Sequence, residues 1–355
     1  MNAIDLFAGP GGMSQGAAMS GIDVHTAIDI DKHSATTYAH NHPATNLLVA
    51  DVQAISTRSI HAIQRAARPN VVFGGPPCQG FSYSNPRHRR RTNPNNWLFR
   101  HFLRFVEILN PDWVVLENVP GIRDTANGYF LASVISGLSQ LGRRVRHGLL
   151  DAADYGVPQH RRRYFIVAHR PNIDFTLPVP TVNVHVTVNE AIRDLPQLPN
   201  GNTICKREYG TSPPSPYARG LRGRSKFCYN NLVTRNNSAV VERYQFIPQG
   251  GNWTDIPKEL MSTYRNLSQC HTGIYHRLRP DAPAIVIGNF RKNMLVHPSA
   301  DRGLSIREAA RLQSFPDHYR FHGSIGFQQQ QVSNAVPPLL AKSVFDSISR
   351  AHTTT

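Results

Sequence analysis

The chain has 355 residues, with 39 Lys or Arg against 23 Asp or Glu and a formal net charge of +16. This length allows two domains, or one large domain with an insertion, around a full hydrophobic core. The basic balance favours a polyanionic partner. No apolar run is long enough to span a membrane and the chain starts without a secretory signal, so we expect a cytoplasmic protein that does not bind membranes.

The first half of the chain alternates strand-like and helix-like segments. Such alternation predicts an α/β fold, with a doubly wound, mostly parallel sheet covered by helices on both faces. The expected strands are 3–7, 24–28, 71–73, 113–116 and 164–167, and the expected helices end near residue 20 or span 32–41, 97–109 and 130–141.

The composition changes near Pro171, after which Pro, Gly, Asn and Arg are frequent and helical periodicity is weak. Ser305 and Glu308 then form a capping-box pattern that predicts a helix start, and a last helix is expected over 337–348. We therefore expect a first domain made of 1–171 and 331–355, a smaller irregular domain over 172–300, and a connecting helical segment over 301–330.

A glycine-rich turn, 5–12, lies between the first strand and the first helix. Backbone N–H groups at such a turn can hold an anion, although a tight strand–helix connection is an equally good interpretation. The spacing departs from Gly-x-Gly-x-x-Gly, which weakens NAD or FAD as the ligand. Asp29 and Asp51 follow the next two apolar runs, where a carboxylate can meet ribose or a base amine; each is also a common helix-cap residue.

Cys78 lies in a Gly/Pro-rich turn, 74–82, directly after the apolar run 71–73. The prolines stiffen the backbone before the sulfur and the glycines allow close approach, as a nucleophile requires. A small buried hydrophobe is the alternative, since most free cysteines are of that kind. The four cysteines are far apart with no Cys-x-x-Cys pair, so we expect no metal site and no disulfide framework.

Charged residues also lie at the ends of later strands. Glu117 follows the strand 113–116 and can act as an acid or form an ordinary salt bridge. Period-2 alternation points Arg161 and Arg163 to one side of the chain and Arg162 to the other. Arginine-rich clusters at 87–91, 143–146, 161–163 and 219–226 favour nucleic acid over solvated faces as their explanation.

In combination these segments resemble the cytosine-C5 DNA methyltransferases, over nearly the whole chain except its middle. Six stretches match in the family's order: 5–12 (DLFAGPGG), 76–82 (PPCQGFS), 117–119 (ENV), 159–163 (QHRRR), 307–317 (REAARLQSFPD) and 331–338 (QVSNAVPP). The resemblance implies an S-adenosylmethionine-dependent methyltransferase fold with a DNA-recognition domain at 172–300.

The resemblance also implies the cofactor, S-adenosylmethionine, with S-adenosylhomocysteine as product. Asp29 stands where the family usually has a glutamate, so the shorter carboxylate must reach further or use a water. The implied cofactor residues are Phe7, Ala8, Gly9, Gly11, Gly12, Asp29, Ile30, Asp51, Val52, Pro77, Asn334 and Ala335.

The family's chemistry assigns roles to four residues. Cys78 would add to C6 of a flipped-out cytosine, because C5 is otherwise a poor nucleophile. Glu117 would donate a hydrogen bond or proton to N3, and Arg163 would hold O2 with Arg161 as support. The base that removes the C5 proton is not evident.

The resemblance makes double-stranded DNA the partner of a bacterial-type enzyme, expected as a monomer in the cytoplasm or nucleoid. A restriction endonuclease acting separately is a possible counterpart. A tRNA cytosine methyltransferase and a DNA-binding regulator without catalysis are the alternatives. The expected DNA contacts are Gln79, Ser82, Arg87, Arg89, Arg90, Arg91, Arg219, Arg222, Arg224 and Arg235.

Overall fold

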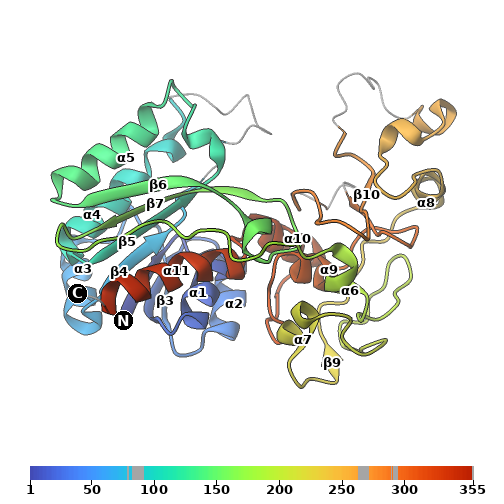
Figure 1. The fold of residues 1–355 in the computed structure, drawn as a ribbon, viewed down its shortest axis with the longest axis horizontal. Helices are drawn as coiled ribbons and strands as arrows, with labels where there is room; N and C mark the ends of the chain where they lie inside the picture. The colour runs from blue at the N-terminus through green and yellow to red at the C-terminus, as the bar shows by residue number, and fades with distance from the viewer. Residues whose placement is uncertain (78–79, 82–91, 263–271, 289, 291–294, 354–355) are drawn as a thin grey trace. The chain divides into compact units, whose positions relative to one another are not determined.

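The computed structural model describes residues 1–77, 80–81, 92–262, 272–288, 290 and 295–353. The chain forms two compact units, coloured along the sequence in Figure 1. Unit 1 consists of Met1–Tyr155, Arg162–Thr181 and Val336–Thr355, and unit 2 consists of Gly156–Arg161 and Val182–Ala335.

Unit 1 is built on a seven-stranded sheet with the order β3-β2-β1-β4-β5-β7-β6. Strands β1 to β5 are parallel, and β7 runs antiparallel to both of its neighbours. The sheet therefore confirms the expected mostly parallel α/β fold. The strands are β1 (Asn2–Leu6), β2 (Asp23–Asp29), β3 (Asn46–Val49), β4 (Val71–Gly74), β5 (Trp113–Asn118), β6 (Arg144–Asp151) and β7 (Arg162–His169).

Three helices cover one face of this sheet: α3 (Thr57–Ala67), α4 (Phe99–Leu109) and α5 (Tyr129–Gln140). In α4, Phe102, Phe105 and Leu109 recur at helical spacing and are buried against apolar side chains of the sheet. Phe130 of α5 joins the same core. Burial of these apolar surfaces holds the layer together.

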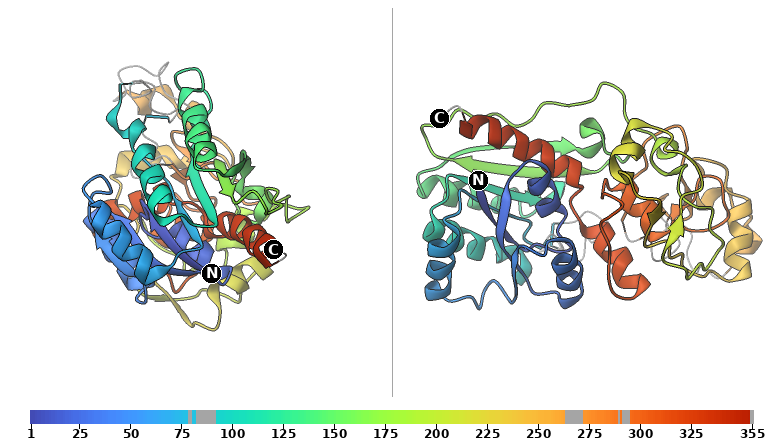
Figure 2. Two further views of the ribbon diagram at one scale, coloured as in Figure 1. Left: turned by 90° about the vertical axis from the view of Figure 1, so that its left-hand side faces the viewer. Right: turned by 90° about the horizontal axis from the view of Figure 1, so that it is seen from below.

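The opposite face carries α1 (Gly12–Met19), α2 (Lys32–Asn41) and α11 (Pro338–Thr353). Helices α1 and α11 pack closely, as Figure 2 shows. Their approach requires glycine at position 16, because a Cβ there would lie 2.6 Å from Cβ of Ala341. Phe345 of α11 also packs edge-on against Phe73 of β4, with ring centroids 5.0 Å apart. The C-terminal helix is thus part of unit 1.

Unit 2 contains short elements around its own apolar core. Its strands form two-stranded pairs, β8 (Arg207–Glu208) with β9 (Phe227–Cys228) and β10 (His276–Arg277) with β11 (Leu295–Val296). Its helices are α6 (Val188–Ile192), α7 (Pro216–Arg222), α8 (Ser238–Gln245), α9 (Ile306–Leu312) and α10 (Ile325–Asn334).

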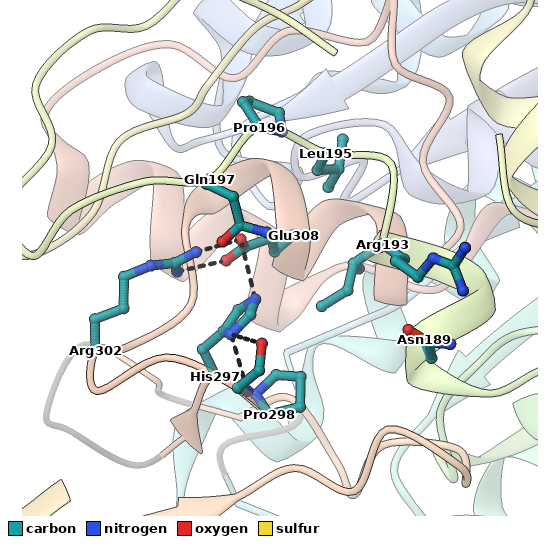
Figure 3. Close-up of a pocket in the computed structure, with 11 residues that line it drawn as sticks. Asn189, Arg193, Leu195, Pro196, Gln197, His297, Pro298, Arg302 and Glu308 are labelled. Carbon is teal, nitrogen blue, oxygen red and sulfur yellow. Dashed lines mark hydrogen bonds and ion pairs between the residues drawn. The ribbon is translucent and has the colours of Figure 1, made fainter. Parts of the chain in front are cut away.

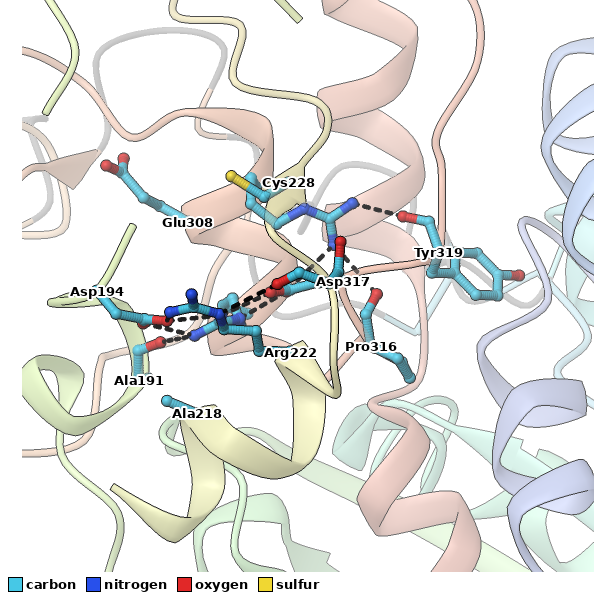
Figure 4. Close-up of polar contacts among 12 residues, drawn as sticks. Ala191, Asp194, Ala218, Arg222, Cys228, Glu308, Pro316, Asp317 and Tyr319 are labelled. Atoms are coloured by element: carbon cyan, nitrogen blue, oxygen red, sulfur yellow. Dashed lines mark hydrogen bonds and ion pairs between the residues drawn. The ribbon is translucent and has the colours of Figure 1, made fainter. Parts of the chain in front are cut away.

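Buried ion pairs join these short elements. Arg311 of α9 is fully buried and holds Asp194 at 3.0 Å and Asp317 at 2.6 Å (Figure 4). Burial and these hydrogen bonds are opposed in their effect on the Asp317 carboxyl, and its pKa is lowered because Arg311 stabilises the charged form. Such paired charges fix how the elements meet.

The same helix takes part in a second buried cluster. As predicted, the capping box of Ser305 and Glu308 starts α9. Arg302 donates to both carboxylate oxygens of Glu308 at 2.9 and 2.7 Å, beside His297 (Figure 3). Burial lowers the pKa of His297 to about 4, so this imidazole is neutral at pH 7. We interpret the cluster as structural.

Two elements of unit 1 are absent from the sequence prediction. Residues 144–151, which the sequence marks as basic, form β6 at an edge of the sheet. Helix α3 is the second, although Ser56 caps it and its buried residues have helical spacing. None of the helices in the described ranges is long and apolar enough to cross a membrane.

Candidate active site at the carboxyl edge of the sheet

The ends of β1, β2, β4 and β5 meet at one edge of the sheet, and the start of antiparallel β7 meets them there. Register pairs Leu6 with Gly74 and Gly74 with Leu116, which aligns the strand ends. Asn118 pairs with Tyr164, next to Arg163. Ligands of doubly wound sheets bind at this edge, where the strand order changes direction between β1 and β4.

The glycine turn after β1 has an unusual backbone. Phe7, Gly9 and Gly11 have positive φ angles of 62°, 56° and 92°. A non-glycine residue in this region is strained, and such strain concentrates at ligand-binding turns. No atom lies within 4 Å of a Cβ built at Gly9, so the turn leaves open space on that side.

Asp29, at the end of β2, holds this turn in place. Its Oδ2 accepts a hydrogen bond from the Gly9 N–H at 2.7 Å, and its Oδ1 accepts one from the Asp31 N–H at 2.7 Å. Burial raises the pKa of Asp29, while these backbone donors oppose the rise. Each carboxylate oxygen keeps a second lone pair that a ribose hydroxyl can use.

Beneath the turn lies a buried polar chain. The Ser14 hydroxyl donates to Oδ2 of Asp5 at 2.6 Å and lies 2.7 Å from the Tyr38 hydroxyl. Burial raises the pKa of Asp5 well above its ordinary value, and the nearby charge of Asp29 adds to the rise. The sequence does not reveal this arrangement, because Ser14 and Tyr38 lie on different helices.

The side chains next to the turn fit the adenosine part of S-adenosylmethionine. Ile30 follows Asp29 and is 65% exposed, an unusual state for isoleucine that a stacked adenine ring would explain. The Asp51 carboxylate accepts the Gln53 N–H at 2.9 Å and can accept an adenine amine as well. Arg104 donates to the Val52 carbonyl at 2.9 Å and fixes this turn.

The turn that carries Cys78 is described only on its two sides; Cys78, Gln79, Ser82, Arg87, Arg89, Arg90 and Arg91 lie outside the described residues. Before it, Asn118 donates to the Pro76 carbonyl at 3.1 Å. After it, Phe81 is buried against Phe130 with ring centroids 5.2 Å apart. Asn118 is a site residue that the sequence argument missed, although it stands beside Glu117.

Glu117 and Arg163 are brought together at the end of β5 and the start of β7. The Arg163 Nε lies 3.0 Å from Oε1 of Glu117, and both side chains are about nine-tenths buried. Glu117 also lies against the turn before Cys78, because a Cβ at Gly75 would be 2.8 Å from Oε2. The salt bridge considered as the ordinary alternative therefore exists, at the edge expected for a catalytic pair.

Arg161, Asn334 and Ala335 belong to unit 2. Arg161 is 1% exposed and donates to the carbonyls of Ser333 and Ala335 on either side of Asn334. Its contacts are backbone carbonyls rather than a carboxylate. No group of three or more His, Cys, Asp or Glu side chains within the described ranges could hold a metal ion.

The arginines expected to contact DNA in unit 2 differ in their surroundings. Arg219, Arg224 and Arg235 are exposed. Arg222 instead donates to the Thr211 carbonyl at 2.7 Å and lies 3.8 Å from the centre of the Tyr209 ring. Arg222 therefore stabilises the end of α7.

A doubly wound sheet whose carboxyl edge joins a glycine turn to a buried Glu–Arg pair defines a cofactor-binding α/β enzyme. Residues 1–350 match the model of the C-5 cytosine-specific DNA methylase family. The chain belongs to this family and is a DNA (cytosine-5)-methyltransferase.

Curated relatives and solved structures agree with this family. The chain is 32% identical to the Type II methyltransferase M1.HphI of Haemophilus parahaemolyticus, covering 99% of this chain and 87% of the relative. It is 33% identical to the Type II methyltransferase M.DdeI of Desulfomicrobium norvegicum, covering 98% and 88%. A prophage-encoded DNA modification methyltransferase of E. coli has a similar structure, with a TM-score of 0.83, 27% identity and 99% of each chain covered.

Proposed function

We propose that Cys78 is the nucleophile of this DNA (cytosine-5)-methyltransferase and that Glu117 and Arg163 activate the cytosine. The observation that carries the proposal is the Glu117–Arg163 pair, 3.0 Å apart at the sheet edge that leads into the Cys78 turn. The close approach of Glu117 to Gly75, with Asn118 bound to Pro76, supports a fixed geometry between carboxyl group and turn.

The roles follow from the charge that develops on the base. When the Cys78 thiolate adds to C6 of the cytosine, electron density moves toward N3 and O2. Glu117 in its protonated form donates to N3, and the Arg163 guanidinium stabilises the charge at O2. After methylation, loss of the C5 proton lets the Cys78 thiolate leave. The cytosine must be flipped out of the duplex for this contact.

The residues of the glycine turn and of the β2 and β3 ends fit S-adenosylmethionine. Phe7, Ala8, Gly9, Gly11 and Gly12 would hold its methionine part, Asp29 and Ile30 its ribose and adenine, and Asp51 and Val52 the adenine edge; Pro77, Asn334 and Ala335 complete the proposed set. When bound, the cofactor supplies a methyl group activated by a sulfonium. Asp29 has a second role in this set, because it orders the glycine turn through the Gly9 N–H.

Double-stranded DNA is the proposed substrate, recognised within 172–300 and by the loop after Cys78. The net charge of +16 supports a polyanionic substrate. Because the relatives are named Type II methyltransferases, we propose that the enzyme is a cytoplasmic monomer that protects DNA against a separate restriction endonuclease.

Methyl transfer measured side by side on duplex DNA and tRNA tests the substrate. We expect incorporation only into DNA, and incorporation only into tRNA would contradict the proposal. Bisulfite sequencing of plasmid from cells expressing the chain should then show protected cytosines in one sequence context. Plasmid from cells expressing Cys78→Ser is the matched control and should show none.

A further inference from the structure

Arg161 makes an unusual set of contacts for a residue next to a catalytic arginine. Its guanidinium is 1% exposed and donates to three backbone carbonyls: Ile287 at 3.1 Å, Ser333 at 2.6 Å and Ala335 at 3.0 Å. All four residues belong to unit 2. Two of these carbonyls lie at the end of helix α10, where the last carbonyls have no partner within the helix and a cation is favoured.

Gln159 binds the same segments from beside Arg161. Its side-chain oxygen accepts the Ile287 N–H at 2.9 Å, so Gln159 and Arg161 together hold both polar groups of one residue. Its amide nitrogen donates to Oε1 of Gln313 at 3.1 Å, and Gln313 donates to the Val332 carbonyl at 2.8 Å. The turn after α10 is therefore held at Val332, Ser333 and Ala335.

Main-chain bonds align the two segments that these side chains join. The His160 N–H donates to the Ala284 carbonyl, and the Ala284 N–H donates to the Pro158 carbonyl, both at 2.9 Å. Segment 158–161 thus lies along segment 284–287. The long reach from Arg161 to the 333–335 turn then depends on a planar, permanently charged fork, which lysine does not have.

We propose that Arg161 is a positioning residue that fixes the 333–335 turn, and with it Asn334, against segment 284–287. It acts on cofactor affinity through the backbone around Asn334 rather than on the charge of the cytosine. This inference rests on the proposed function, because it takes Asn334 as a cofactor contact. It replaces the role of electrophilic support with one that the contacts of Arg161 explain.

Arg161→Lys tests the inference, since it keeps the charge and removes the fork. Binding of S-adenosylhomocysteine to the full chain without DNA should weaken about tenfold, the scale of one missing charge-assisted bond. The KM for S-adenosylmethionine should rise by a similar factor, while kcat at saturating cofactor stays within about twofold. Arg162→Lys is the matched control, because Arg162 is exposed on β7, and it should change neither value.

Two further variants separate the possible failures. Asn334→Ala should also weaken S-adenosylhomocysteine binding; wild-type affinity in this variant would show that Asn334 does not contact the cofactor and would overturn both claims. Weak binding by Asn334→Ala with wild-type binding by Arg161→Lys would overturn the positioning role alone. A loss of kcat with unchanged affinity in Arg161→Lys would restore the catalytic role. If Arg161→Lys does not fold, Gln313→Leu removes the Val332 bond and should weaken binding about threefold; no change would contradict the inference.

Discussion

The contact between Glu117 and Gly75 makes glycine at position 75 a sensitive test of the active site. A Cβ at position 75 would lie 2.8 Å from Oε2 of Glu117, whereas ordinary contacts begin at 3.4 Å. In Gly75→Ala the carboxyl group must move by about 0.6 Å, although Arg163 holds its other oxygen at 3.0 Å. Displacements of this size reduce catalysis because the reacting groups lose their alignment, by about 10- to 100-fold here.

Stability should respond differently from activity. The clash involves the end of a side chain, and alanine reduces the entropy of the unfolded chain, so the free energy of unfolding should stay within about 1 kcal/mol of the wild type. Urea unfolding and kcat on duplex DNA measure the two effects. Gly220→Ala is the control, because nothing lies within 4 Å of a Cβ there, and it should keep full activity. Wild-type kcat in Gly75→Ala would refute the proposed need for a fixed Glu117.

Three further predictions concern charge. Asp5→Asn should raise stability at pH 7: burial holds the pKa of Asp5 above its unfolded value of about 3.9, so the wild type loses stability as pH rises through this interval, and equal pH slopes in urea titrations would contradict this. Glu308→Gln should lower the free energy of unfolding at pH 7 by about 3–5 kcal/mol, because it leaves Arg302 buried without its partner. Since the pKa of Glu308 is lowered to about 2, the wild type should lose this advantage as pH falls from about 4 toward 2, and a pH-independent difference would count against the pairing. Neutralising Arg89, Arg90 and Arg91 together should weaken DNA binding and flatten its dependence on salt, by ~0.9 in slope for each phosphate that is no longer neutralised, and an unchanged slope would remove the loop from the DNA interface.

The sequence predicted the elements whose burial is complete. Strand 71–74 is apolar throughout and helix 32–41 is capped by Asp31, and both lie where the pattern places them. Strand β6 was not predicted because it lies at the sheet edge with one neighbour, so most of its side chains face solvent and form a basic cluster in the sequence. An edge strand has too little buried surface to impose an apolar pattern.

The active-site contacts divide in the same way. Glu117 and Arg163 could be assigned to one edge because strand ends meet there. The bond from Asn118 to Pro76 and the bonds from Arg161 to the 333–335 turn could not, because they join residues 42 to 174 positions apart. Only the folded backbone brings such groups together, and a single sequence carries no signal for them.

The central claim is that the Cys78 thiolate adds to C6 of the target cytosine. Duplex DNA with 5-fluorocytosine in place of the target base tests it most directly, because the C–F bond blocks the loss of a proton that frees the enzyme. With S-adenosylmethionine present, we predict a stable covalent complex for the wild type, with the modified peptide mapping to Cys78, and none for Cys78→Ser. A complex of equal yield with Cys78→Ser, or a modified peptide that lacks Cys78, would contradict the account.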